Sequence, residues 1–126
     1  MPVDFSHFKV GPTGPLYRQV VQYFKKSMLL GELKNAEEVP SRRHLAALLG
    51  INPTTVQKIY RQLEEEGLIQ TTPYSKTIVT MDEGKRQILQ KELIQDELKD
   101  LITSFKTCNM DFKEFIALVT QVWNEE

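Results

Sequence analysis

A four-residue segment, Gly-Ile-Asn-Pro at positions 50–53, separates two stretches whose apolar residues repeat at helical spacing. Glycine is favoured just after a helix ends, and proline is favoured at the first position of the next helix. Asn52 can cap that second helix by accepting a hydrogen bond from its first turn. The segment therefore predicts two consecutive helices with about three residues between them, which is the spacing of a helix-turn-helix.

The two predicted helices on either side of this segment each have one apolar face. Ser41 can cap the shorter helix, which comes first. In that helix Leu45, Leu48 and Leu49 are expected to face inward. The second helix spans about residues 53–66, and its apolar face consists of Val56, Ile59, Tyr60 and Leu63.

The residues before this pair predict one more helix. Apolar residues at positions 16, 17, 20, 21, 24 and 28 form a helical stripe. Pro15 suits the first turn of that helix, and Gly31 is typical of its end. Residues 32–40 are then a polar connection to the helix pair. Residues 1–14, which glycine and proline interrupt, are predicted to form an extended N-terminal arm.

A β-hairpin is predicted directly after the helix pair. The β-prone runs at 68–72 and 76–80 flank the turn-forming residues Pro73-Tyr74-Ser75. A hairpin in this position is a wing, which we assign to residues 69–80. The predicted fold class is therefore mainly α with a small β-hairpin. It consists of a winged helix-turn-helix domain over residues 15–80, with residues 53–66 as the recognition helix, and a helical tail.

The tail, residues 81–126, predicts two helices. One runs from Asp82 to about Phe105, and the other is capped by Asp111 with Glu114 three residues further on. Their apolar residues are more numerous than two helices can cover on each other, and an exposed apolar stripe implies a partner. A second copy of the chain is the economical partner, so we predict a dimerisation region. The predicted interface residues are Leu93, Leu98, Leu101, Ile102, Phe105, Phe115, Val119 and Trp123.

The formal net charge of −1 is a cancellation between two halves of the chain. Residues 1–79 carry ten Lys and Arg against seven acids, a net of +3, whereas residues 80–126 carry six against ten, a net of −4. The 25 residues from Val39 to Leu63 contain four Lys and Arg and no acid. An anionic partner would be repelled least at that segment.

The sequence offers no residues for catalysis. His7, His44 and Cys108 are its only imidazoles and its only thiol, and no cluster has metal-ligand spacing. No phosphate-binding loop and no nucleophile elbow is present. We therefore predict a protein that is not an enzyme and has no metal and no cofactor. The single cysteine, the start of the chain and the absence of a long apolar run predict a cytoplasmic protein with no membrane partner.

Five short motifs occur in a fixed order between residues 15 and 79. They are Pro-Leu-Tyr-Arg-Gln-Val at 15–20, Gly-Glu-Leu at 31–33, Val-Pro-Ser-Arg-Arg-His-Leu-Ala at 39–46, Leu-Gly-Ile-Asn-Pro-Thr-Thr-Val-Gln at 49–57 and Tyr-Arg-Gln-Leu-Glu-Glu-Glu-Gly-Leu-Ile at 60–69. This ordered set closely resembles the GntR family of bacterial transcription regulators. Only 47 residues follow Val79, which is too few for the large effector-binding domain of many members. The chain therefore looks like the short YtrA-type branch, whose tail serves dimerisation.

The resemblance implies a sequence-specific DNA-binding regulator, a homodimeric repressor on a palindromic operator. In a helix-turn-helix the second helix enters the major groove. Gln57 could then pair with adenine, Thr54 and Thr55 could contact a phosphate or a thymine methyl group, and lysine and arginine suit phosphates. By resemblance, Arg43 is a DNA contact. The predicted contacts are Ser41, Arg43, Asn52, Thr54, Thr55, Gln57, Lys58, Arg61, Tyr74 and Lys76.

Some of these residues have a simpler interpretation. Ser41 and Asn52 are helix caps first, and DNA contact would be an additional role. Tyr74 is equally compatible with DNA contact and with simple exposure at the wing tip. Arg42 could be merely solvated, and Tyr60 is expected in the core.

Three segments depart from the family pattern. Pro53 stands where many members have an arginine at the start of the recognition helix, so one contact is missing. The wing tip has no glycine, and residues 35–38 replace the usual Pro-Gly before the second helix. The wing contacts are therefore the weakest part of the resemblance. The sequence identifies neither an operator nor an effector.

A second hypothesis belongs to a different class. The acidic tail would also suit a winged-helix protein-interaction module whose helices bind a different protein.

Overall fold

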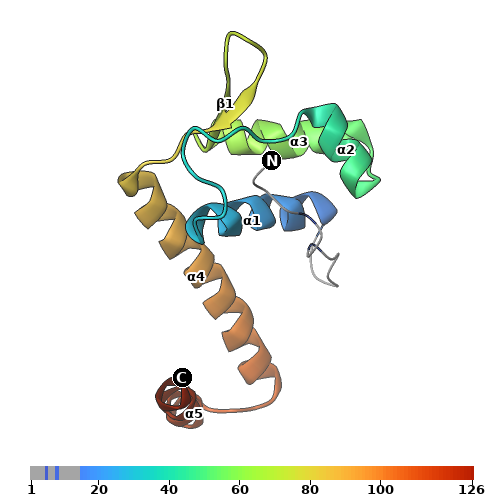
Figure 1. The fold of residues 1–126 in the computed structure, drawn as a ribbon. Coiled ribbons are helices and arrows are strands. Elements are labelled where there is room, and N and C mark those ends of the chain that lie inside the picture. The colour runs from blue at the N-terminus through green and yellow to red at the C-terminus, as the bar shows by residue number, and fades with distance from the viewer. Residues whose placement is uncertain (1–4, 6–7, 9–14) are drawn as a thin grey trace. The chain divides into compact units, whose positions relative to one another are not determined.

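The computed structural model describes Phe5, Phe8 and residues 15–126. In that part of the chain the elements follow the order α1 (Leu16–Leu29), α2 (Arg42–Leu49), α3 (Pro53–Glu65), β1 (Ile69–Thr71), β2 (Thr77–Val79), α4 (Glu83–Thr107) and α5 (Phe112–Glu125) (Figure 1). This order confirms a mainly α fold with a small hairpin. The chain forms two compact units, one ending at Gln90 and the other comprising Lys91–Glu126.

The caps and turns around α2 and α3 are those that the sequence predicts. Ser41 Oγ accepts a hydrogen bond from the backbone N–H of His44 at 3.1 Å, and Asn52 Oδ1 accepts one from Thr54 at 2.7 Å. Gly50 adopts the left-handed conformation, with a φ of 63°, which a residue with a Cβ rarely tolerates. Pro53 occupies the first turn of α3. Local sequence therefore determines the helix-turn-helix.

The core of the first unit lies between α1, α2 and α3. Phe24 and Tyr60 meet edge to face with their ring centroids 6.0 Å apart. Phe5 adds a stacked contact with Tyr23 at 5.1 Å and an edge contact with Phe24 at 5.5 Å, and Phe8 meets Tyr23 edge to face at 5.4 Å. Apart from Phe5 and Phe8, the predicted arm lies outside the described residues. The fully buried apolar side chains are Val20, Val21, Phe24, Leu33, Val39, Leu45, Val56, Ile59, Tyr60, Leu63 and Val79.

One inward-facing prediction for α2 is wrong. Leu45 is buried, but Leu48 is 52% exposed. Ala46, rather than Leu48, completes the buried face of this two-turn helix, and Leu48 lies on the other side of Leu45. The face is therefore narrower than the three leucines suggested.

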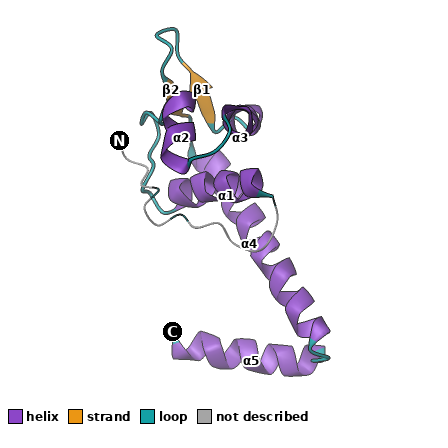
Figure 2. Cartoon of the chain, turned by 90° about the vertical axis from the view of Figure 1, so that its right-hand side faces the viewer, coloured by secondary structure: helices purple, strands orange, loops and turns teal. Residues whose placement is uncertain are grey.

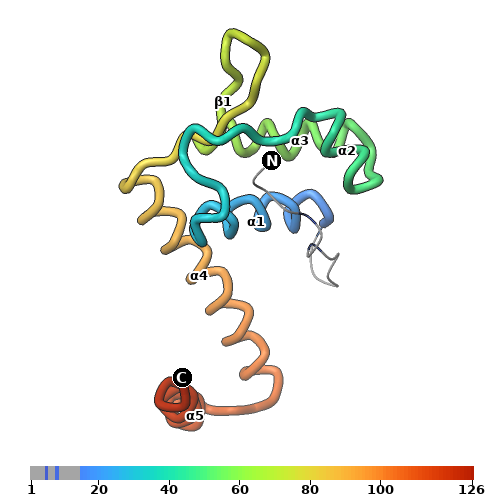
Figure 3. The backbone as a smooth tube through the Cα atoms, viewed as in Figure 1, coloured from blue at the N-terminus to red at the C-terminus, as the bar shows by residue number. Residues whose placement is uncertain are grey.

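The connection between α1 and α2 is not simply polar, contrary to the prediction for residues 32–40. Leu33 and Val39 are buried. The backbone N–H of Val39 donates to Thr77 O at 2.9 Å, and that of Val79 donates to Glu37 O at 2.9 Å. Figure 3 shows this segment running beside the base of the hairpin. The strand β2 thus has a hydrogen-bonded neighbour on each side, because β1 pairs with it through Ile69–Val79 and Thr71–Thr77.

The wing closes without glycine. Thr72 and Lys76 are joined by a backbone hydrogen bond of 2.7 Å, and Ser75 has a φ of 63°. Ser75 therefore takes the left-handed position that glycine often fills in such turns. The strands are shorter than the predicted runs, since the residues at each end of the hairpin belong to the turn or the connections.

The first turns of α4 belong to the first unit. Asp82 Oδ1 accepts a hydrogen bond from the backbone N–H of Lys85 at 2.8 Å, which confirms the predicted cap. The Lys85 ammonium donates to Gly67 O at 2.7 Å, and Leu89 is buried. The winged helix is thus extended by these turns, and the two units divide beyond the predicted boundary, between Gln90 and Lys91.

The second unit contains the rest of α4 and all of α5. Asp111 Oδ1 caps α5 by accepting a hydrogen bond from Glu114 N at 2.8 Å, as predicted. Phe105 and Phe115 pack on each other across the turn with their ring centroids 4.7 Å apart. Figure 2 shows α5 running at an angle to α4 rather than lying along it. Within this unit only Phe115 is buried.

Candidate nucleic-acid interface

The outer face of α3 is open to solvent. Four predicted contacts on this helix, Thr54, Gln57, Lys58 and Arg61, are exposed, and Thr55 is half-buried. The inner face is anchored in the core by its four predicted apolar residues, all buried. Because one face is fixed, the other presents its side chains in a defined order, as a recognition helix must.

The start of α2 lies close to this face in sequence and carries the second group of predicted contacts. Ser41 and Arg43 are exposed, and the first turn of α2 has no acidic residue. Backbone N–H groups at a helix start favour an anion, and an arginine beside them adds charge and hydrogen-bond donors. The geometry suits contact with a phosphate group.

Two predicted contacts already serve as caps. The Ser41 hydroxyl and the Asn52 amide oxygen each hold the first turn of the following helix. Both side chains are exposed, so these bonds leave part of each group accessible. Capping is established for both residues, and DNA contact stays a prediction.

Lys58 has an intramolecular partner that the sequence did not indicate. Its ammonium lies over the ring of Tyr17, 3.8 Å from the centroid. Such a cation–π contact holds the side chain of α3 against α1. The lysine is still exposed, so a phosphate could compete with the ring for it. No local signal links Tyr17 to Lys58, because they belong to different helices.

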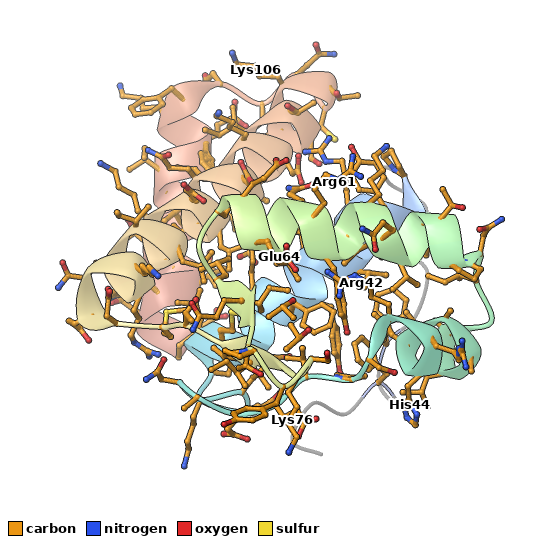
Figure 4. All side chains as sticks on the ribbon, turned by 90° about the horizontal axis from the view of Figure 1, so that it is seen from above. Arg42, His44, Arg61, Glu64, Lys76 and Lys106 are labelled. Atoms are coloured by element: carbon orange, nitrogen blue, oxygen red, sulfur yellow. The ribbon has the colours of Figure 1, made fainter. Side chains whose placement is uncertain are left out.

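The wing exposes its two predicted contacts. The Tyr74 side chain is 87% exposed at the tip, and Lys76 lies on the hairpin (Figure 4). An aromatic ring and a cation at a protruding tip are suited to the sugar-phosphate backbone. Both side chains are exposed with respect to the part of the chain that the structure describes.

Tyr60 is in the core, as the sequence predicts. Its hydroxyl donates a hydrogen bond to Pro40 O at 2.5 Å. Burial raises the pKa of Tyr60 well above its ordinary value, and the nearby Arg42 charge lowers it to a smaller extent. This tyrosine is therefore a neutral hydrogen-bond donor that ties α3 to the segment before α2.

The predicted interface residues of the tail fall into two groups. Phe115 is buried, and Leu93, Ile102 and Phe105 are half-buried. Leu98, Leu101, Val119 and Trp123 are exposed, Trp123 by 80%. The predicted interface does not include further exposed apolar residues of the same two helices, some of which the helical spacing already places on their apolar faces. These are Ile88, Ile94, Phe112, Ile116, Leu118 and Val122.

Two further findings concern metal binding and membrane crossing. Phe5, Phe8 and residues 15–126 contain no group of three or more His, Cys, Asp or Glu placed to hold a metal ion. None of the helices in that part of the chain combines the length and the apolar character that a membrane crossing requires.

A helix pair with a glycine turn, an outward-facing second helix and a hairpin directly after it define a winged helix-turn-helix DNA-binding domain. Residues 16–79 match the family described as bacterial regulatory proteins, gntR family. The chain belongs to the GntR family of transcription regulators. It is a regulator rather than an enzyme, since its relatives and its fold are those of transcription factors.

Relatives and solved structures extend the likeness beyond the winged helix. The HTH-type transcriptional repressor YtrA of Bacillus subtilis is 37% identical over 87 residues, which are 64% of this chain and 67% of that protein. A GntR family regulator from Listeria monocytogenes has a TM-score of 0.74 at 26% identity, covering 89% of this chain and 98% of its own. YtrA from Sulfolobus acidocaldarius has a TM-score of 0.54 at 25% identity, covering 98% and 97%. The resemblance to the YtrA type is therefore confirmed.

Proposed function

We propose that this chain is a homodimeric repressor that binds a palindromic operator and blocks a promoter in the cytoplasm. The exposed outer face of α3, inside a 25-residue segment without acids, is the observation that carries the DNA-binding part of the proposal. Repression is supported by the similarity to the B. subtilis repressor YtrA. In this proposal α3 reads the major groove and residues 69–80 contact the flanking backbone.

The dimer is supported by α5. This helix has 14 residues, and an isolated helix of that length is marginal in water. Apart from Phe115 its apolar residues are exposed, although they lie on one stripe. A second copy would cover this stripe and would place two winged helices on one DNA duplex. In this proposal residues 81–126 form the dimerisation region, with the interface itself in the second unit beyond Gln90, residues 15–80 form the DNA-binding domain, and residues 1–14 form an arm.

A titration with the chain's own promoter region tests the function. Fluorescence anisotropy should show tighter binding to the labelled promoter than to random DNA of equal length at moderate salt. The logarithm of the binding constant should fall linearly with the logarithm of the salt concentration, because phosphate contacts release counterions. Equal affinity for both DNAs would contradict a sequence-specific regulator.

Substitutions of Gln57 and Arg43 should change DNA binding in different ways. The Gln57→Ala variant should lose about 1–3 kcal/mol of discrimination at one operator position, because it removes a base contact. The Arg43→Ala variant should weaken binding to all sequences alike, because a phosphate contact carries no sequence information. Competition titrations with single-base operator variants measure both effects. A sequence-selective loss for Arg43→Ala would contradict its phosphate role.

The exposed tail also favours a second candidate, a module that binds a different protein through α4 and α5. Sedimentation of the pure protein separates the two functions. A stable monomer of 14.6 kDa at micromolar concentration would favour a heterologous partner, whereas a dimer supports the proposed repressor.

A further inference from the structure

Arg42 and Glu64 form an ion pair between the first residue of α2 and the last turn of α3. The distance from Arg42 Nη2 to Glu64 Oε1 is 2.7 Å, and both side chains are about one-third exposed, at 34% and 36%. Figure 4 shows the two residues side by side between these helices. The Thr71 hydroxyl of β1 donates to the same carboxylate oxygen at 3.5 Å. One carboxylate therefore connects α2, α3 and the wing.

The Arg42 guanidinium is also held by Tyr60. Its central carbon lies 5.1 Å from the centroid of the Tyr60 ring, and Tyr60 in turn donates its hydrogen bond to Pro40, two residues before Arg42. The Arg42 Nε is buried and has no hydrogen-bond partner in the described part of the chain. This guanidinium is held by a ring and a carboxylate, and its Nε is buried. It is therefore poorly placed to donate a pair of hydrogen bonds to a phosphate.

Glu64 places a negative charge on the helix that is proposed to bind DNA. It is the first acid after the acid-free segment that ends at Leu63, and it lies on the helix that the proposed function places in the groove. An unpaired carboxylate there would repel the phosphate backbone. With Arg42 as its partner, its charge is neutralised inside the protein before DNA arrives.

We propose that Arg42 is a positioning residue for DNA recognition. It neutralises Glu64 and fastens the first turn of α2, which carries Arg43 and follows Ser41, to the recognition helix. It does not itself contact DNA. This inference rests on the proposed DNA-binding function and adds a residue that neither the motif nor the helix spacing indicated.

Three variants test the proposal with the labelled promoter of the previous titration. Arg42→Gln should weaken binding on the order of tenfold, because coupled charge pairs lose this much when one partner is removed. The double variant Arg42→Gln with Glu64→Gln should recover affinity to within about threefold of the wild type, since the pair becomes a neutral amide pair. Its net charge equals that of the wild type, so the salt dependence should have the same slope.

Arg43→Gln is the matched control, because it makes the same substitution at the neighbouring predicted phosphate contact. It should reduce the salt slope by about 0.9, and Glu64→Gln should not rescue it. The double variant could instead bind as weakly as Arg42→Gln, with a salt slope that is smaller than that of the wild type by about 0.9. Arg42 would then contact phosphate, and the proposal would be overturned. If Arg42→Gln does not fold, the double variant is compared with the wild type alone. Affinity within about threefold and an unchanged salt slope support the proposal, and a slope smaller by about 0.9 overturns it. Failure of the wild type to prefer its promoter would instead refute the proposed function.

Discussion

Replacing Val119 with aspartate should convert the protein from a dimer to a monomer. Val119 lies on the exposed apolar stripe of α5 and is 40% exposed in the single chain, so the substitution does little to the fold of one copy. In the proposed dimer it would bury an unpaired carboxylate, which is strongly unfavourable. The sedimentation mass should fall from about twice 14.6 kDa to the monomer value.

The same substitution should reduce promoter affinity on the order of 100-fold, because two linked domains gain at least this much from binding together. Gln121→Asp is the matched control. It places the same charge on the same helix, two residues away and on the opposite side. It should leave both mass and affinity unchanged. A dimeric Val119→Asp protein would exclude this stripe from the interface.

Replacing Phe24 with alanine should destabilise the protein by about 3–5 kcal/mol. Phe24 is fully buried, and its ring meets those of Phe5 and Tyr60. The truncation would leave a cavity directly behind the recognition helix, because Tyr60 belongs to α3. Urea titration followed by circular dichroism measures the loss.

Leu30→Ala is the control for this cavity. Leu30 caps the same helix but is 65% exposed, so its truncation should change stability by less than about 0.5 kcal/mol. All titrations need one protein concentration, because the stability of a dimer depends on it. Equal effects of the two substitutions would mean that the Phe24 contacts contribute little.

Helix boundaries were predictable because their signals are local. Asn52 and Pro53 start α3, Asp111 starts α5, and each capping side chain acts on an N–H within three residues. The wing was predictable for the same reason, since its two strands are joined by one short turn. The winged helix and its exposed recognition face could therefore be anticipated from the sequence.

Contacts between distant residues could not be anticipated. The pairing of residues 36–39 with β2 brings together segments separated by two helices, and nothing local in the sequence Ala-Glu-Glu-Val indicates that partner. The Arg42–Glu64 and Tyr17–Lys58 contacts likewise depend on how helices pack. Leu48 was misplaced because an apolar residue in a short helix does not by itself reveal which side the neighbour covers.

The hydrogen bonds between residues 36–39 and β2 define the smallest piece that could be transplanted into another protein. They join chain positions before α2 to positions after α3. A graft that kept the segment before α2 but ended after α3 would leave the buried Val39 without β2 beside it and its N–H without the Thr77 acceptor. Lys85 and Leu89 hold the start of α4 to the same body. Chimaeric regulators built on this chain are therefore best joined within α4, beyond Leu89, and not between the recognition helix and the wing.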